Sequence, residues 1–225
     1  MKPEPPEEEN DHNKTPDVHE EDTNHDSGLE NNVVPEAPIA PENNFIDVPA
    51  GAWFADAVQY VYNNGMMVGT SYNEFSPEAL TTRGMIVSVL YRLEGEDAVI
   101  GDSIFKDVAL NDWYANGVSW AAANGIVSGY GDGTFGPNDP ITREQMASIL
   151  YRYAQYKGYN MNKNANLNQF TDAAAINDWA YTAVRWANTQ GLMSGMNNGT
   201  IAPQGYATRA QVASMFMRFC ENVAK

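Results

Sequence analysis

The 225-residue chain lacks the side chains on which many catalytic and metal sites depend. Its one cysteine, Cys220, excludes an intramolecular disulfide framework and any multi-cysteine zinc or iron–sulfur site. Its histidines, His12, His19 and His25, all lie near the N-terminus, so the part that folds must work without imidazole. That excludes the usual catalytic triads and most zinc hydrolase sites. No run of about 18 apolar residues is present, so we expect no membrane insertion.

Basic residues are also scarce. The chain has 13 Lys and Arg against 29 Asp and Glu, which gives a formal net charge of −16. A surface this acidic repels phosphate backbones and anionic lipid headgroups, so we expect neither nucleic acid nor a membrane surface as a partner.

Most of the acidity lies in residues 1–44. This segment holds 13 acids and two lysines, contains several prolines, and has no aromatic residue. It cannot bury enough apolar surface to offset the entropy lost on ordering, so we predict a disordered acidic linker. It begins without the apolar run of a secretory signal, and a linker that starts at residue 1 has nothing to link. We therefore expect the C-terminal part of a longer, exported protein.

The rest of the chain is a threefold repeat. We divide it into repeat one (45–100), repeat two (101–165) and repeat three (166–225). Each repeat opens with a Phe-x-Asp sequence and then reaches a tryptophan. Glycines follow this tryptophan by 12 and 16 residues, a Thr-Arg pair places its arginine 30 residues after it, and another arginine comes nine residues later. These spacings are identical in all three repeats, which chance does not produce.

Within each repeat the pattern predicts a helix, a loop and a second helix. Apolar residues recur at helical spacing after the tryptophan, and a glycine 12 residues on suits a helix C-terminus. Asp112 and Asp178 are candidate N-caps of the first helices. The second helix begins at the threonine, and capping boxes are complete in repeats two and three, whereas Met85 leaves repeat one with half of this device.

Two short helices cannot bury an apolar face by themselves, so the three repeats must share one core. We therefore predict an all-α fold of three helix-loop-helix repeats in a compact, pseudo-threefold assembly, with three equivalent grooves between the repeats.

The repeated Thr-Arg arginines are the first candidate site residues. Each lies in the first turn of a helix, where the macrodipole disfavours a cation by about 0.3–1 kcal/mol. One explanation is an ion pair with the opening aspartate of a repeat. The other is an anion site that combines free helix N–H groups, the dipole and a guanidinium able to grip a carboxylate. The residues concerned are Arg83, Arg143 and Arg209, with Asp47, Asp107 and Asp172.

The repeated tryptophans and glycines leave two interpretations open. A tryptophan at helical spacing is more often a core residue, but it could instead lie at a groove and cover the C–H face of a sugar. The second glycine of each repeat is either a turn residue or a place where a ligand approaches the backbone. These residues are Trp53, Trp113 and Trp179, with Gly69, Gly129 and Gly195.

Nothing in the repeats marks a catalytic centre. The repeated acid occurs once per repeat, whereas glycoside hydrolysis needs two particular carboxyl groups in one cleft. Asp132 and Asp139 flank a glycine-rich loop but lack the spacing of an EF-hand. We therefore expect no enzyme activity, no cofactor and no metal.

Taken together, these elements resemble S-layer homology (SLH) domains, and three in tandem would cover about residues 45–222. The resemblance rests on the Phe-x-Asp-Val opening, the Trp-led helix, Gly-x-x-x-Gly, the loop at residues 131–137 and the Thr-Arg start of the second helix. It implies a non-catalytic anchor that folds as a three-pronged helical assembly. Such triplets bind secondary cell-wall polysaccharide, often carrying pyruvate ketals, at the surface of Gram-positive-type bacteria.

The resemblance also implies which residues line the grooves and contact the pyruvate carboxylate and the sugar hydroxyls. In this chain they are Asp47, Trp53, Gly69, Arg83, Asp107, Trp113, Gly129, Arg143, Asp172, Trp179, Gly195 and Arg209. Repeat two matches the family pattern best, while repeat one lacks the Asp-Gly-Thr loop and has Gly84-Met85 after its Thr-Arg pair. We therefore expect glycan binding above all in grooves that use Arg143, and least in those that rely on the loop of repeat one.

The leading hypothesis is noncovalent attachment of a surface protein to a pyruvylated wall glycan, at the bacterial cell surface. The alternative is a helical repeat that contacts neighbouring surface-layer proteins, and a third is a wall-active enzyme. If the glycan hypothesis holds, Arg143→Ala abolishes sedimentation with cell walls and leaves the fold intact.

Overall fold

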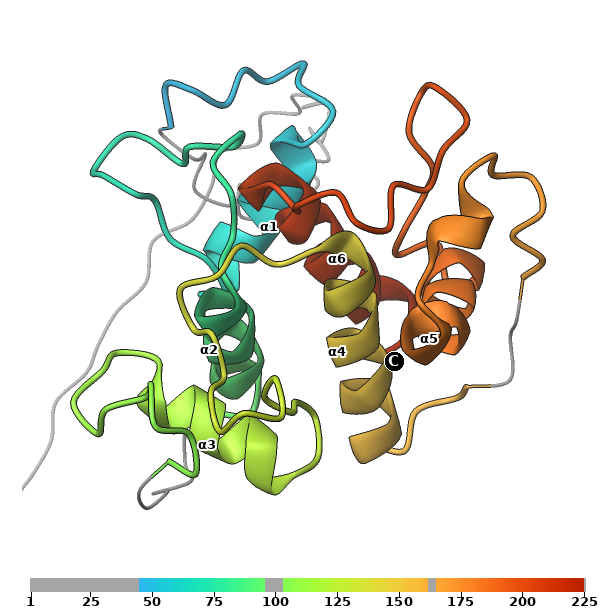
Figure 1. The fold of residues 1–225 in the computed structure, drawn as a ribbon. Helices are drawn as coiled ribbons and strands as arrows, with labels where there is room; N and C mark the ends of the chain where they lie inside the picture. The colour runs from blue at the N-terminus through green and yellow to red at the C-terminus, as the bar shows by residue number, and fades with distance from the viewer. Residues whose placement is uncertain (1–44, 96–102, 162–164, 225) are drawn as a thin grey trace, which may run out of the picture. The chain divides into compact units, whose positions relative to one another are not determined.

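The computed structural model describes residues 45–95, 103–161 and 165–224 (Figure 1). These residues form six α-helices and no strand, which confirms the predicted all-α fold. The predicted acidic linker at 1–44 lies outside the described residues. The helices are α1 (Ala55–Asn63), α2 (Arg83–Leu93), α3 (Ala115–Ala123), α4 (Arg143–Tyr156), α5 (Asp178–Thr189) and α6 (Arg209–Asn222), with a 3-10 turn at Ala173–Ala175.

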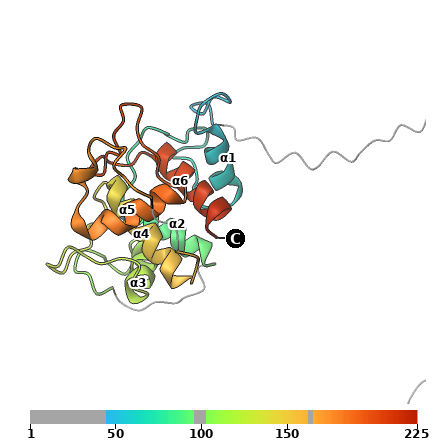
Figure 2. The ribbon, with the colours of Figure 1, turned by 90° about the vertical axis from the view of Figure 1, so that its right-hand side faces the viewer.

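The helices pack between repeats. The second helix of one repeat packs against the first helix of the next, so that α2 contacts α3 and α4 contacts α5. The last helix, α6, returns to α1, and both views show these two helices side by side (Figures 1 and 2). Each repeat therefore buries its apolar faces only with the help of the other two, as the length of its helices predicts.

A ring of backbone hydrogen bonds lies at the centre of the assembly. The amide of Thr81 donates to Ala207 O (3.0 Å), that of Ala207 to Ile141 O (2.9 Å), and that of Ile141 to Thr81 O (2.9 Å). The three residues come from equivalent places, directly before the cap of each second helix. We call Thr81, Ile141 and Ala207 the central ring. Its closed pattern confirms the predicted pseudo-threefold arrangement.

The second helices begin as the sequence predicts. Thr142 with Gln145, and Thr208 with Gln211, form complete capping boxes, and Thr82 caps α2 through its side chain alone. The predicted caps of the first helices are wrong. Tyr114 and Asn177 occupy the cap positions of α3 and α5 without a side-chain bond, Asp178 is already helical, and Asp112 instead accepts from the amide of Ala109.

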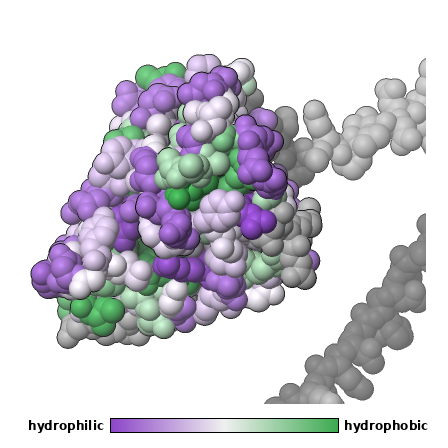
Figure 3. All heavy atoms as spheres, turned by 45° about the vertical axis from the view of Figure 1, so that its right-hand side comes forward, coloured by the Kyte–Doolittle hydropathy of each residue, from purple (hydrophilic) through white to green (hydrophobic). Residues whose placement is uncertain are grey.

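None of the described helices is long and apolar enough to cross a membrane. On the face shown in Figure 3, hydrophilic residues cover most of the described surface, and hydrophobic residues form small separate patches. This face therefore offers no broad apolar area.

Candidate functional site

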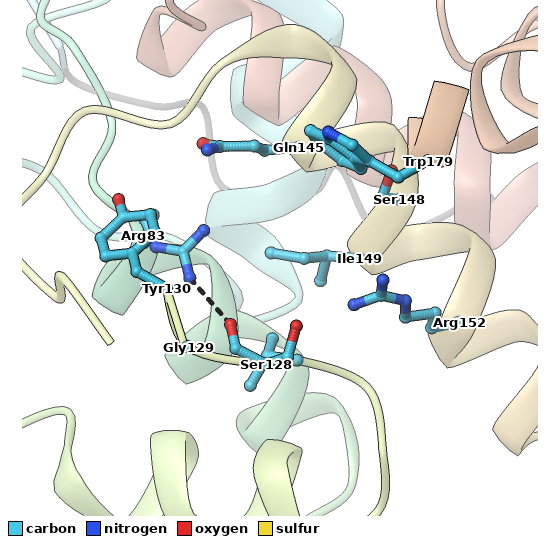
Figure 4. A pocket seen from close by; sticks show the side chains of 10 residues that line it. Arg83, Ser128, Gly129, Tyr130, Gln145, Ser148, Ile149, Arg152 and Trp179 are labelled. Carbon is cyan, nitrogen blue, oxygen red and sulfur yellow. Dashed lines mark hydrogen bonds between the residues drawn. The ribbon is translucent and has the colours of Figure 1, made fainter. Parts of the chain in front are cut away.

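The described residues form three grooves beside the second helices, with volumes of about 400, 400 and 300 Å³. We name them the Arg83, Arg143 and Arg209 grooves after the first-turn arginine of each. Every groove takes residues from all three repeats. The Arg83 groove combines Arg83 of repeat one, the 128–130 segment and α4 of repeat two, and Trp179 of repeat three (Figure 4). The sequence predicted grooves between repeats, but not that a third repeat completes each one.

The first-turn arginines are buried and bonded to backbone carbonyls of the next repeat. Arg83 donates from Nε to Phe135 O (2.9 Å) and from Nη2 to Ser128 O (3.2 Å), the bond drawn in Figure 4. Arg143 and Arg209 repeat this geometry with Ile201 and Ser194, and with Phe75 and Val68. The three side chains are only 6–7% exposed. Each groove therefore holds a guanidinium whose position is fixed on two sides.

The predicted ion pairs of these arginines are not formed. Within the part of the chain that the structure describes, none of the three makes a salt bridge with a carboxylate. Burial lowers the pKa of each guanidinium group, and nearby acidic groups such as Asp107 oppose that shift only in part. Arginine still carries its full charge at neutral pH. The grooves therefore contain positive charge that neutral carbonyls solvate but do not neutralise.

The opening aspartates hold the loop that the arginines also hold. The carboxylate of Asp107 accepts from the amides of Phe135 and Gly136, both at 2.8 Å, so the peptide groups around Phe135 are bound by Asp107 on one side and Arg83 on the other. We call this arrangement the loop clamp. It recurs as Asp172, Ile201 and Arg143, and as Asp47, Phe75 and Arg209. The aspartates are not among the described residues that line the grooves, so the structure gives them a positioning role.

The helix N–H groups expected to bind an anion are already occupied. The amides of Arg83 and Gly84 donate to Asp139 O (3.0 Å) and Pro137 O (2.8 Å) in the next repeat, and the other two second helices are bound in the same way. The expectation of free N–H groups is therefore wrong. Anion binding in these grooves depends on side chains.

The repeated tryptophans are exposed, so their interpretation as core residues is wrong. Trp53, Trp113 and Trp179 are 64%, 61% and 54% exposed and line the Arg143, Arg209 and Arg83 grooves in that order. Trp120 and Trp186, which lie seven residues later in repeats two and three, are buried instead. An exposed indole beside a guanidinium is a surface on which a sugar ring can lie.

The repeated glycines line the grooves, and the opening phenylalanine of each repeat packs directly against its glycine. A methyl group built on Gly69 or Gly129 would lie 2.6 Å from a ring carbon of Phe45 or Phe105, and Gly195 meets Phe170 in the same way. Real Cβ atoms do not approach so closely. These glycines therefore let the backbone form the groove wall while an aromatic ring fills the space behind it.

A second arginine in each groove was not predicted as a site residue. It comes nine residues after the first on the same helix, a rotation of roughly 180° at 3.6 residues per turn, so the two point into different grooves. Helical arithmetic on the repeat could have found it. These arginines, with a serine of the same helix, are Arg152 and Ser148 in the Arg83 groove, Arg218 and Ser214 in the Arg143 groove, and Arg92 and Ser88 in the Arg209 groove.

The grooves combine the repeats in an order that the sequence did not reveal. The loop of repeat two, the best family match, lines the groove of Arg83, whereas Arg143 faces the loop of repeat three. The loop of repeat one lines the Arg209 groove. The predicted equivalence of the grooves is also wrong, because position 85 in the Arg209 groove is methionine where the other grooves have Gln145 and Gln211.

Comparison with known proteins identifies the three repeats. The family model described as "S-layer homology domain" matches residues 44–84, 104–147 and 169–213. The chain is 30% identical over 197 residues to the surface-layer 125 kDa protein of Lysinibacillus sphaericus, which covers 85% of this chain and 16% of that protein. It is 31% identical over 169 residues to the amylopullulanase of Thermoanaerobacterium thermosulfurigenes, covering 75% of this chain and 9% of that enzyme.

The exoglucanase XynX of Acetivibrio thermocellus is 32% identical over 171 residues, which cover 75% of this chain and 16% of the enzyme. The chain thus spans less than a fifth of the length of each of these relatives. The matched segments are the three repeats whose helices, clamps and grooves are described above. The chain therefore belongs to the S-layer homology domain family.

Proposed function

We propose that this chain attaches a surface protein to the bacterial cell wall by binding an anionic, pyruvylated wall polysaccharide in its grooves. S-layer homology domains anchor surface proteins to the cell wall and bind cell-wall polysaccharide. The relatives include a surface-layer protein and large enzymes of which this region is a small part. The cargo of this chain is accordingly a surface protein or an enzyme that the module holds at the wall.

The observation that carries the proposal is the pairing, three times over, of a fixed guanidinium with an exposed tryptophan in an open groove. Six of the seven arginines in the chain line these grooves, although residues 45–225 carry 16 acids against 11 bases. Arginines gathered in the grooves of an otherwise acidic domain attract anions to those grooves. A pyruvate ketal places a carboxylate on a sugar ring, so one residue of such a glycan suits both the arginine and the tryptophan.

The lining of the grooves supports binding without hydrolysis. Among the described residues that line them, none is Asp or Glu, and glycoside hydrolysis normally uses a pair of such side chains. The polar residues present include arginine, glutamine, asparagine, serine and threonine, which suit contacts with carboxylate and hydroxyl groups. The proposed role is therefore that of a non-catalytic anchor.

The test should spare the first-turn arginines. Arg143→Ala would leave the carbonyls of Ile201 and Ser194 without their donor, so loss of binding by that variant could reflect a damaged fold. The exposed tryptophans allow a cleaner experiment. We compare the full chain with the triple variant Trp53→Ala, Trp113→Ala, Trp179→Ala in sedimentation with purified cell walls. Tyr72→Ala is the control, because Tyr72 is 98% exposed and lines no groove.

The expected result is that the full chain and Tyr72→Ala sediment with the walls, whereas the triple variant stays in solution with an unchanged melting temperature. Walls treated with mild acid to remove the ketals should bind the full chain at least about tenfold less strongly, because hydrogen bonds to a charged group are lost. Equal binding to treated walls contradicts recognition of the ketal. Full binding by the triple variant contradicts the grooves as the site and favours a protein partner.

A further inference from the structure

The Arg83 groove holds two guanidinium groups that face each other. Figure 4 shows Arg83 and Arg152 on opposite sides of this groove, with Ile149 between them. Arg152 is half-buried, and within the described residues it has neither a hydrogen bond nor an ion pair. The second arginine of the Arg143 groove, Arg218, donates to Gly191 O at 3.4 Å. Arg152 therefore approaches its groove without a protein acceptor.

The two cations of the Arg83 groove oppose each other. Burial is the main cause of the lowered pKa of Arg83; Tyr130, Asp139 and Asp107 partly oppose it, and the charge of Arg152 adds a smaller lowering. No described acid lines this groove, so nothing in its wall neutralises the pair. Like charges held together in a partly desolvated groove are unfavourable unless an anion lies between them. The pair of cations therefore favours an anionic ligand in this groove.

A glutamine of α4, Gln145, adds a hydrogen-bond donor to the groove. The side-chain oxygen of Gln145 accepts from the amide of Thr142, which leaves its NH₂ group for a ligand. Ser148 donates to the carbonyl of Glu144, so its oxygen is left to accept from a sugar hydroxyl. In the Arg209 groove the residue equivalent to Gln145 is Met85, which offers no donor.

Two aromatic side chains enclose the Arg83 groove. The ring of Tyr130 lies 4.8 Å from Cζ of Arg83, and its hydroxyl donates to Asp139 Oδ2 at 2.9 Å, which fixes the ring in place. Trp179 lines the same groove from repeat three. The residues equivalent to Tyr130 are Thr70 and Met196, so only this groove offers a sugar two aromatic surfaces among the described residues.

We propose that the Arg83 groove is the high-affinity site of the chain and that Arg152 is its second anion-binding residue. This inference rests on the proposed function. A sugar carboxylate binds between Arg83 and Arg152 while its ring contacts Trp179 and Tyr130. The Arg143 groove is weaker, because its second arginine is engaged by a carbonyl and its loop lacks the tyrosine. The Arg209 groove is the weakest, because it also lacks the glutamine.

Each groove contains one exposed indole, which allows its occupancy to be measured separately. The chain has five tryptophans, and single Trp→Phe variants assign the N–H signals of Trp53, Trp113 and Trp179 in a nitrogen-15 NMR spectrum of the full chain. The probes are the cyclic pyruvate ketal of methyl glucopyranoside and methyl glucopyranosiduronic acid, which carry a carboxylate from two sources. The acetone ketal of the same sugar is the uncharged control.

The expected result is that a carboxylate probe shifts the Trp179 signal at the lowest concentration and the Trp113 signal at the highest. Arg152→Gln should raise the half-saturation concentration at Trp179 by about tenfold or more and leave that at Trp53 unchanged. The matched variant Arg218→Gln should affect Trp53 and spare Trp179. Arg152→Lys, which keeps the charge, should recover part of the loss.

The inference is overturned if Trp53 or Trp113 saturates before Trp179, or if Arg152→Gln leaves the Trp179 titration unchanged while the probe still binds. A different result marks failure of the proposed function itself. In that case no groove indole responds to either carboxylate, or the acetone ketal shifts all three as strongly. The probe that binds more tightly identifies the source of the carboxylate. Tighter binding of the ketal indicates a pyruvate substituent, and tighter binding of the uronic acid indicates an oxidised sugar.

Discussion

The central ring with its loop clamps and the groove walls follow opposite rules. The ring and clamps repeat the same hydrogen bonds three times, although the residues that supply them vary from Phe75 to Ile201. The groove walls share two arginines, a tryptophan, a glycine and a serine but differ elsewhere, and one equivalent position is Thr70, Tyr130 or Met196 in the three grooves. The scaffold is therefore symmetric while the binding chemistry is not, because backbone geometry tolerates substitutions that a ligand would detect.

The largest expected effect is a difference in the free energy of unfolding between variants of two arginines in α4. Arg143→Ala removes two hydrogen bonds from a buried guanidinium and leaves two carbonyls unpaired, so it should lower the free energy of unfolding by about 3 kcal/mol. Arg152→Ala removes no such bond and should change it by less than about 0.5 kcal/mol. Urea denaturation of both variants measures the difference. Equal losses would show that Arg152 stabilises the scaffold as much as Arg143 does.

A smaller effect is expected at the other half of the clamp. Asp107→Asn replaces one of two carboxylate acceptors by a donor that faces the amides of Phe135 and Gly136. We expect a loss of about 1–2 kcal/mol in thermal or urea unfolding. The exposed Glu78→Gln is the matched control and should change stability by less than about 0.5 kcal/mol. A stable Asp107→Asn would mean that the arginine alone holds the loop.

A cross-link between α2 and α4 lies outside the ring and makes stability depend on pH. Tyr153 of α4 donates to Glu94 at 2.5 Å, and Lys157 pairs with the same carboxylate at 2.9 Å. Burial, followed by the bond to Glu94, raises the pKa of Tyr153 above its ordinary value of 10.0. The unfolded chain loses this proton first, so the contribution of Tyr153 is complete below about pH 10 and is lost as pH rises towards the native pKa.

Unfolding measured between about pH 10 and pH 11 should therefore show a decline in stability about 1 kcal/mol steeper for the natural chain than for Tyr153→Phe. Tyr156→Phe serves as a control, since Tyr156 is 44% exposed and its ring lies 6.4 Å from that of Tyr153. Identical slopes for all three proteins would show that the α2–α4 cross-link is weak in solution.

The smallest effect concerns the loops of the clamps. Ser76 and Ala202 have φ values of 56° and 48°, while repeat two has Gly136 at the same place with a φ of 70°. Glycine accepts this conformation without steric cost, so Ala202→Gly should stabilise the chain by about 0.5 kcal/mol. The reverse change, Gly136→Ala, should destabilise it. Melting temperatures of these two variants check the sign, and a loss in Ala202→Gly would contradict it.

Much of the scaffold could be predicted from the sequence. Fixed spacings from tryptophan to arginine revealed the repeat. The sequence Thr142-x-x-Gln145 predicted the start of a helix. Gly125 predicted the end of another helix, and its φ is 68° in the structure. Each of these signals is local, because a cap or a positive φ is satisfied within a few residues. The pairing of α2 with α3 is not local. Periodicity shows that a helix has an apolar face but not which helix covers it.

The site was harder to predict for the same reason. The sequence singled out Arg83 and Trp179, but it could not show that they share a groove with the loop of repeat two. It assigned Asp107 to the ligand, whereas that carboxylate binds two backbone amides. It overlooked Arg152, which lines a groove formed by three separate stretches of chain.

The most direct test of the account is a crystal structure of the chain soaked with a pyruvate-ketal glycoside. We expect the ligand in the Arg83 groove first, with its carboxylate at the guanidinium groups of Arg83 and Arg152 and its ring against Trp179. A ligand bound with its carboxylate away from all six groove arginines, or sugar density only outside the three grooves, would contradict it.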